Sequence, residues 1–121
     1  MALRGATASV AIKVELRDGY HVNSNTPSDE YLIPLRLTWN AAPLQVASVE
    51  FPKPRMEKYS FSEQPLSVFV EGFQISTRLR TPSSAPLGPK TLTGKLRYQA
   101  CNDRLCLPPR TVEVKLPVEI R

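Results

Sequence analysis

Two stretches near the C-terminal end of the chain alternate apolar and polar side chains, and the connection between them holds both cysteines. Residues 92–100 place apolar or small side chains at every second position, and residues 112–120 repeat the pattern. A period of two is typical of strands with one buried face, because successive side chains in a strand point to opposite sides. The pattern therefore predicts two strands joined by a connection that presents Cys101 and Cys106.

The N-terminal half carries the same pattern in shorter pieces. Residues 9–16 alternate strictly, and Asp18-Gly19 predicts the turn that follows them, since glycine tolerates a positive φ. Glu71-Gly72 is expected to turn a hairpin. Residues 55–65 show no period and are expected to form an ordered surface loop. Further strands are expected over residues 31–39 (with Tyr31 on the apolar face), 46–51, 66–70 and 73–79.

Every regular element predicted in this way is a strand, and no segment has a helical period longer than a turn. The 12 prolines of the chain favour short strands with stiff connections. About seven or more such strands are typical of an antiparallel β-sandwich. At 121 residues the chain fits one domain. Residues 1–121 are therefore expected to form a single all-β domain, with its core over residues 9–120.

Cys101 and Cys106 are the only cysteines of the chain, and four residues separate them. Across a tight turn such a pair forms a disulfide, remains a dithiol, or alternates between the two. Closing so short a loop adds only about 2 kcal/mol to the free energy of unfolding, which weakens a purely structural interpretation. Arg104 favours a thiolate by its charge and Asp103 opposes it. The residues alone leave open both a redox-active pair and a local clip.

Other kinds of site find little support. Two thiolates and His21, the only histidine, make three ligands, whereas structural zinc takes four, so we expect neither a metal nor an organic cofactor. His21 is expected to be a partly buried hydrogen-bonding residue rather than a ligand or a base. The formal net charge is +5, but the cationic residues are scattered and do not interleave with aromatic rings. Nucleic acid is therefore not an expected partner.

The cysteines say more about the cellular compartment of the protein than its terminal segments do. No stretch approaches the roughly 18 apolar residues of a membrane span, and residues 1–6 lack the apolar core of a secretory signal. Two closely spaced cysteines suit an oxidising space or redox catalysis. The protein is then either cytosolic or exported with a signal that lies outside this sequence.

The cysteine-containing segment Tyr98-Gln-Ala-Cys-Asn-Asp-Arg-Leu-Cys-Leu-Pro-Pro109 is distinctive. It is accompanied by Gly19-Tyr-His-Val-Asn-Ser-Asn25, by Tyr31-Leu-Ile-Pro34, and by a stretch from Phe51-Pro-Lys-Pro54 to Phe61-Ser-Glu63. Together these segments resemble the periplasmic N-terminal domain of the thiol:disulfide interchange protein DsbD, from about Ser9 to Ile120. The better-known enterobacterial members have one more residue between the cysteines and carry tyrosines in place of His21 and Asn23.

The resemblance implies an immunoglobulin-like sandwich that receives electrons from a membrane-embedded dithiol domain and passes them to periplasmic thioredoxin-fold proteins, for example in cytochrome c biogenesis. It assigns the mixed disulfide with partners to Cys106 and the resolving step to Cys101. It also implies a loop that shields the cysteines, which by position is Lys58–Phe61, with Tyr59 or Phe61 as its aromatic cap. Further candidates for lining the site are His21, Asn23 and Arg104.

The expected function is therefore thiol–disulfide exchange within a relay, by a periplasmic domain that is monomeric in isolation. The alternative is an immunoglobulin-like protein-binding module whose disulfide only clips a hairpin. The two hypotheses differ in whether the cysteine pair changes its oxidation state during function.

Overall fold

The computed structural model describes all residues from 1 to 121 and contains ten β-strands. It has no helix that could cross a membrane. The strands pair antiparallel and form three sheets. The first sheet contains β1 (Thr7–Glu15), β7 (Gly72–Arg80) and β4 (Gln45–Glu50); the second contains β10 (Arg110–Ile120), β8 (Gly88–Tyr98) and β3 (Arg36–Asn40); the third contains β5 (Arg55–Glu57), β6 (Leu66–Val70), β2 (His21–Asn23) and β9 (Ala100–Cys101).

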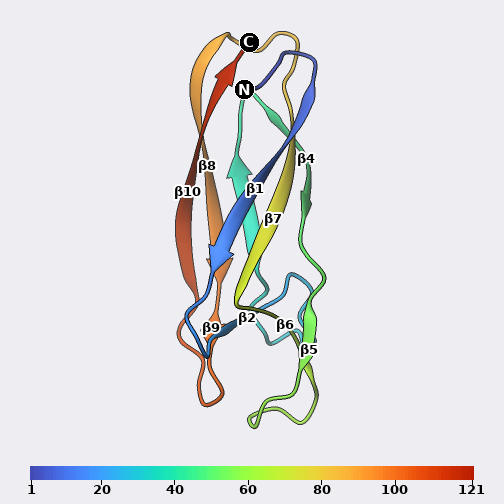
Figure 1. The fold of residues 1–121 in the computed structure, drawn as a ribbon, viewed down its shortest axis with the longest axis vertical. Helices are drawn as coiled ribbons and strands as arrows, with labels where there is room; N and C mark the ends of the chain where they lie inside the picture. The colour runs from blue at the N-terminus through green and yellow to red at the C-terminus, as the bar shows by residue number, and fades with distance from the viewer.

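The first two sheets form the layers of an elongated sandwich, and the smaller third sheet lies at one end of it (Figure 1). The period-two pattern places the core between the layers. In β8, Leu92 and Leu96 are buried while Lys95 and Arg97 between and beyond them are exposed. From the facing layer, Ile75 of β7 is also fully buried, at 0% exposed. The predicted antiparallel all-β sandwich is confirmed.

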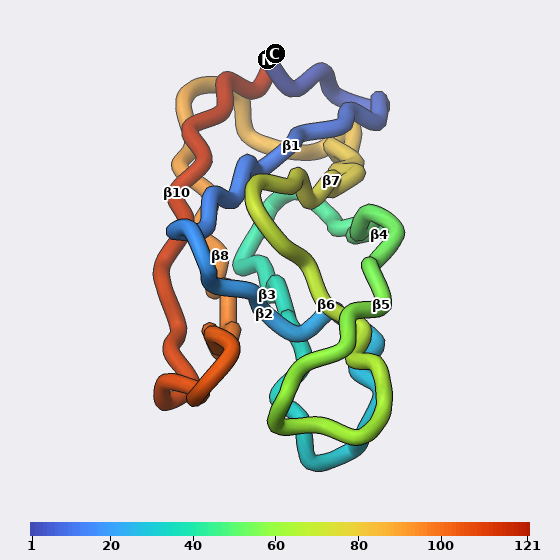
Figure 2. Tube along the Cα trace, turned by 60° about the horizontal axis from the view of Figure 1, so that its bottom comes forward, coloured from blue at the N-terminus to red at the C-terminus, as the bar shows by residue number.

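The two termini meet at the end of the sandwich opposite the third sheet (Figures 1 and 2). Ala2 forms a parallel bridge with Ile120. The amide of Ala2 donates to the carbonyl oxygen of Glu119 at 2.7 Å, and the amide of Arg121 donates to the carbonyl oxygen of Ala2 at 2.9 Å. Both ends of the chain are thus anchored side by side, far from the cysteines.

Trp39 of β3 connects the two layers. Its indole Nε1 donates a 3.0 Å hydrogen bond to Oγ1 of Thr77 in β7, a residue that is 0% exposed. Gly94 of β8 lies opposite Trp39 in the strand register. A Cβ added at Gly94 would come within 2.9 Å of the Cε3 atom of Trp39. The absence of a side chain at this position therefore makes room for the indole ring.

The predicted strand over residues 31–39 is wrong in its first half. Tyr31 is 84% exposed rather than part of an apolar face. Its amide donates to Oδ1 of Asp29 at 3.1 Å, and the amide of Leu32 donates to the carbonyl oxygen of Asp29 at 3.1 Å. These bonds form a turn, and Pro34 has no amide hydrogen for a ladder. The strand β3 therefore begins only at Arg36.

The predicted hairpin at Glu71-Gly72 is also wrong. The strand β6 pairs with β2 and β5, whereas β7 pairs with β1 and β4. The two residues therefore carry the chain from one sheet to another, and Glu71 adopts a φ of 60° at the corner. The predicted loop over residues 55–65 holds in part, since its first three residues pair with β6 as β5.

Candidate functional site

The two cysteines close a short turn in the connection between β9 and β10, which we call the cysteine loop. Cys101 ends β9, and its sulfur is bonded to that of Cys106 at 2.05 Å. Between them Asn102 forms an Asx turn, in which its Oδ1 accepts hydrogen bonds from the backbone amides of Arg104 and Leu105, each at 2.8 Å. These local hydrogen bonds fix the turn that brings the two sulfurs together.

The two cysteines differ in exposure. Cys101 is 2% exposed, whereas Cys106 lies on the surface. The neighbours of Cys106 are apolar and also exposed, Leu105 by 52% and Leu107 by 39%. A second protein can therefore reach Cys106 directly, while Cys101 is accessible only through its bonded partner.

The short strand β2 places His21 on the same face of the third sheet as Cys101. In the ladder between β2 and β9, His21 is paired with Cys101 and Val22 with Ala100. Val22 belongs to the apolar core, and Ala100 packs against the same cluster. Because successive side chains in a strand alternate between faces, His21 and Cys101 both point away from the core.

The segment between β5 and β6, residues 58–65, covers this face and is called the cap loop. The ring of Tyr59 stacks on the imidazole of His21, with centroids 4.1 Å apart and planes at 16°. The ring of Phe61 stacks on Tyr59 at 5.4 Å. The cap loop also contacts the cysteine loop, because Oγ of Ser60 donates a 3.0 Å hydrogen bond to the carbonyl oxygen of Asp103. The two loops lie next to each other at this end of the sandwich (Figures 1 and 2).

Burial shifts the pKa values of the stacked pair in opposite directions. Burial lowers the pKa of His21 below 6.5, and the carboxylate of Glu57 opposes that shift. Burial raises the pKa of Tyr59 above 10.0, and Glu57 adds to the rise. Both rings are therefore uncharged near pH 7. Stacking between them is accordingly a contact of neutral rings.

A cavity of about 560 Å³ opens beside the stacked rings. The residues His21, Tyr59 and Asp103 contribute to its wall from β2, the cap loop and the cysteine loop. The end of β1, the turn after it and the connection between β6 and β7 complete the wall. Neither cysteine lines this cavity, but the cap loop and the cysteine loop both contribute to its wall.

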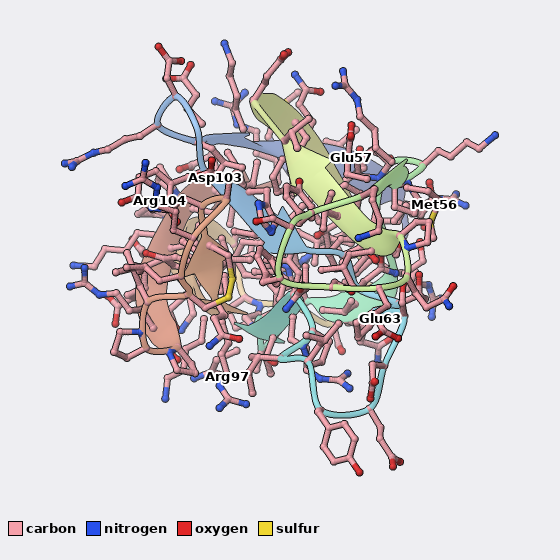
Figure 3. The ribbon with its side chains drawn as sticks, turned by 90° about the horizontal axis from the view of Figure 1, so that it is seen from below. Met56, Glu57, Glu63, Arg97, Asp103 and Arg104 are labelled. Atoms are coloured by element: carbon pink, nitrogen blue, oxygen red, sulfur yellow. A yellow bond between two sulfur atoms is a disulfide. The ribbon has the colours of Figure 1, made fainter.

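The other sequence candidates occupy different positions. Asn23 is 2% exposed, and its Nδ2 donates a 3.0 Å hydrogen bond to the carbonyl oxygen of Ile33, which ties the following loop to β2. Arg104 is exposed beside Asp103 on the cysteine loop and forms no ion pair (Figure 3). The structure thus gathers the cysteines, His21 and the aromatic residues of the cap loop, whereas Asn23 supports the loop that follows β2.

Sequence reasoning missed two residues of this end of the molecule. Glu57 influences the pKa of both stacked rings, and Ser60 connects the cap loop to the cysteine loop. Each acts on residues distant in sequence, and neither belongs to a motif. The only sequence signal for this segment is the family resemblance, which places the shielding loop at residues 58–61.

Replacing Tyr59 with alanine is expected to raise the rate at which Cys101 is alkylated in the reduced protein by about tenfold, because the ring covers the face that Cys101 shares with His21. Mass spectrometry of each cysteine-containing peptide measures the rate. Phe61→Ala is the matched control, since Phe61 is the outer ring of the stack, and a smaller increase is expected. Equal rates in the wild type and in Tyr59→Ala would contradict a covering role.

The fold and the site define a class of protein, an all-β sandwich that carries a disulfide with one buried and one accessible cysteine beside a loop of stacked aromatic rings. The chain belongs to the family described as thiol:disulfide interchange protein DsbD, N-terminal, whose model matches residues 1–117. The family resemblance of the sequence is thereby confirmed.

A solved structure shares this architecture. The chain is similar to the N-terminal domain of DsbD from Neisseria meningitidis in the reduced form, with 19% sequence identity, a TM-score of 0.62, and coverage of 96% of this chain and 82% of that chain. A comparison with curated proteins finds no match. The structural match confirms the immunoglobulin-like fold.

Proposed function

We propose that this chain is a thiol–disulfide exchange domain that works through Cys101 and Cys106. The observation that carries this proposal is the unequal exposure of the pair, since Cys101 is 2% exposed and Cys106 lies on the surface. An exchange reaction needs one sulfur that meets the partner and a second sulfur nearby that resolves the mixed disulfide. Membership of the DsbD N-terminal family supports the same reaction.

The reaction has two displacement steps. In the reduced protein, the Cys106 thiolate attacks one sulfur of a partner disulfide, which forms a mixed disulfide and releases the other partner sulfur as a thiolate. Cys101 then attacks the sulfur of Cys106, the bond to the partner breaks, and the second partner thiolate leaves. Two electrons pass to the partner, and the bond between Cys101 and Cys106 forms. In this direction the domain is a protein-disulfide reductase.

The proposed partners are a membrane-embedded dithiol domain that supplies electrons and periplasmic thioredoxin-fold proteins that receive them. The surroundings of Cys106 support docking of a protein, because Leu105 and Leu107 are exposed next to it and Phe61 of the cap loop is 44% exposed. Apolar and aromatic side chains at the centre of a patch are typical of protein interfaces. The periplasm is an oxidising compartment in which such a pair can cycle.

Incubation of the reduced protein with an oxidised thioredoxin-fold protein tests the proposal. Thiols are blocked at intervals with a mass label, and the labels on each protein are counted. The expected result is that this chain loses labels at the rate at which the partner gains them. If both cysteines of this chain keep their labels while the partner stays oxidised, the disulfide has only a structural role.

The reduction potential of the pair provides a second measurement. Structural disulfides have potentials below about −300 mV, whereas exchangeable ones lie higher. We expect a value above that limit, obtained by equilibrating the protein in glutathione buffers and quantifying its free thiols. A lower value would favour a binding module with a structural disulfide.

A further inference from the structure

His21 is a buried titratable residue for which the two displacement steps have no role. It is 2% exposed, and its Nε2 is buried without a hydrogen-bond partner, so the expectation of a partly buried hydrogen-bonding residue is wrong. Buried polar atoms in native proteins are nearly always paired, so an unpaired one calls for an explanation. The position of His21 relative to the disulfide provides one.

The strand register places the side chains of His21 and Cys101 side by side. The two residues are directly opposite in the antiparallel ladder between β2 and β9, and the Cβ atoms of such pairs lie about 5 Å apart on the same face. Both residues are 2% exposed. The stacked ring of Tyr59 lies over the imidazole at 4.1 Å. Cys101 is buried and does not line the adjacent cavity, so little water can carry its proton away directly, whereas His21 contributes to the wall of that cavity.

We propose that His21 accepts the proton of the Cys101 thiol in the step that resolves the mixed disulfide, an assignment that rests on the exchange function proposed above. The nucleophile in that step is the thiolate, and burial of a thiol in apolar surroundings disfavours its ionisation. Cys101 therefore needs a neighbouring base, and His21 is the neighbouring group that can act as one. The exposed Cys106 can instead lose its proton to solvent.

The proposed step balances as follows in atoms and electrons. The Cys101 S–H bond breaks, and its proton moves to Nε2 of His21, which becomes an imidazolium. The Cys101 thiolate forms a bond to the sulfur of Cys106, and the bond between Cys106 and the partner breaks with both electrons on the departing partner sulfur. The imidazolium then releases its proton through solvent to that thiolate. His21 returns to the neutral form, and the protein is left oxidised.

The groups around His21 suit a proton acceptor. Burial lowers the pKa of His21 and keeps it neutral near pH 7, so Nε2 is free to accept a proton. The carboxylate of Glu57, from β5, stabilises the imidazolium once it forms. Tyr59 faces the imidazole from the cap loop, Asp103 of the cysteine loop lines the same cavity as His21, and the adjacent position of β6 is uncharged Val70. The remaining charged residues around the shared cavity are Lys13, Glu15, Arg17, Asp18 and Glu71.

A role in packing alone would require only the ring of His21, because stacking on Tyr59 needs no nitrogen. The variant His21→Phe keeps an aromatic ring at this position and removes the proton acceptor. It therefore separates the two roles. The variant His21→Ala leaves space under Tyr59 that added imidazole can enter.

The test follows both displacement steps in the wild-type chain with a chromogenic aromatic disulfide, dithiobis(nitrobenzoate). The first coloured thiolate is released when Cys106 attacks, and the second is released when Cys101 resolves the mixed disulfide. With His21 as the base, the resolving rate is expected to be flat from about pH 6.5 to about pH 8. A rate that rises tenfold per pH unit across this range would overturn the proposal, since it would mean that the solvent-generated thiolate reacts unaided.

The variants give the second part of the test. In His21→Phe the resolving rate at neutral pH is expected to fall by about 100-fold, a loss typical of removing a general base. The rate of the first step is expected to be unchanged and is the internal control for folding and for the reactivity of Cys106. In His21→Ala, added imidazole is expected to restore the resolving rate in proportion to its concentration. Normal resolution in His21→Phe would overturn the proposal.

These outcomes separate this inference from the exchange function itself. A wild-type chain that reduces a thioredoxin-fold protein, together with a His21→Phe variant that resolves normally, would remove only the role of His21. A wild-type chain that never exchanges with such a protein would remove both the exchange function and the role of His21.

Discussion

Replacing Cys101 with serine is expected to convert a short-lived intermediate into a stable covalent complex between this protein and an oxidised thioredoxin-fold partner. Cys106 is exposed and can attack the partner disulfide, whereas the resolving sulfur is missing in this variant. Cys106→Ser is the matched control, because it leaves only the residue that is 2% exposed. The yield of complex with Cys106→Ser is expected to be at least about 100-fold lower.

Mass spectrometry of the intact mixture under non-reducing conditions measures the yield of complex. Peptide mapping of the complex is expected to find the partner on Cys106. The assignment of roles would be reversed if Cys106→Ser accumulated the complex and Cys101→Ser did not. Equal trapping by both variants would mean that the exposure of the two cysteines does not determine which one attacks.

The second large effect is expected on stability, at the contact between Trp39 and Gly94. Trp39→Ala removes a ring that bridges the two layers and leaves Oγ1 of the buried Thr77 without its donor, so the free energy of unfolding is expected to fall by about 3 kcal/mol. Gly94→Ala places a Cβ 2.9 Å from Cε3 of the indole and is expected to cost about 2 kcal/mol.

The double variant distinguishes this contact from two independent losses. Without the indole, a methyl group at Gly94 no longer overlaps it, so the two changes together are expected to cost less than their sum by about 1 kcal/mol or more. Urea unfolding of the oxidised proteins measures all three variants, with the exposed Thr38→Ala on the same strand as the control. If the two losses in free energy of unfolding simply add, contact with the indole ring does not explain the absence of a side chain at Gly94.

The sandwich was predictable because its long strands each bury one face. In β8, for example, the buried Leu92, Gly94 and Leu96 alternate with the more exposed Thr93, Lys95 and Arg97, and the period alone indicates a strand. The strand predictions fail where local hydrogen bonds form a turn, or where the chain passes from one sheet to another. The turn around Asp29 removes Tyr31 from its expected strand, and Glu71 sends the chain into another sheet although a glycine follows it, as in many hairpins.

The parts of the site that could be predicted are those formed by residues close together in the sequence. The cysteine pair could be recognised from its spacing, and the turn between Cys101 and Cys106 is held by neighbouring residues. The position of His21 beneath Tyr59 depends on strand register and on a loop from a distant part of the chain. Its unusual pKa depends on burial and on Glu57, which no residue pattern indicates. Long-range packing of this kind had to be seen in three dimensions.

The parallel bridge between Ala2 and Ile120 has a consequence for how this domain can be attached to other molecules. A tag, a surface or another domain joined at either terminus would hold the sandwich by the same pole. The end of the sandwich that carries the disulfide would then point away from the attachment and move through solution. The disulfide could then dock with one partner and afterwards with another while the domain stays attached by its termini.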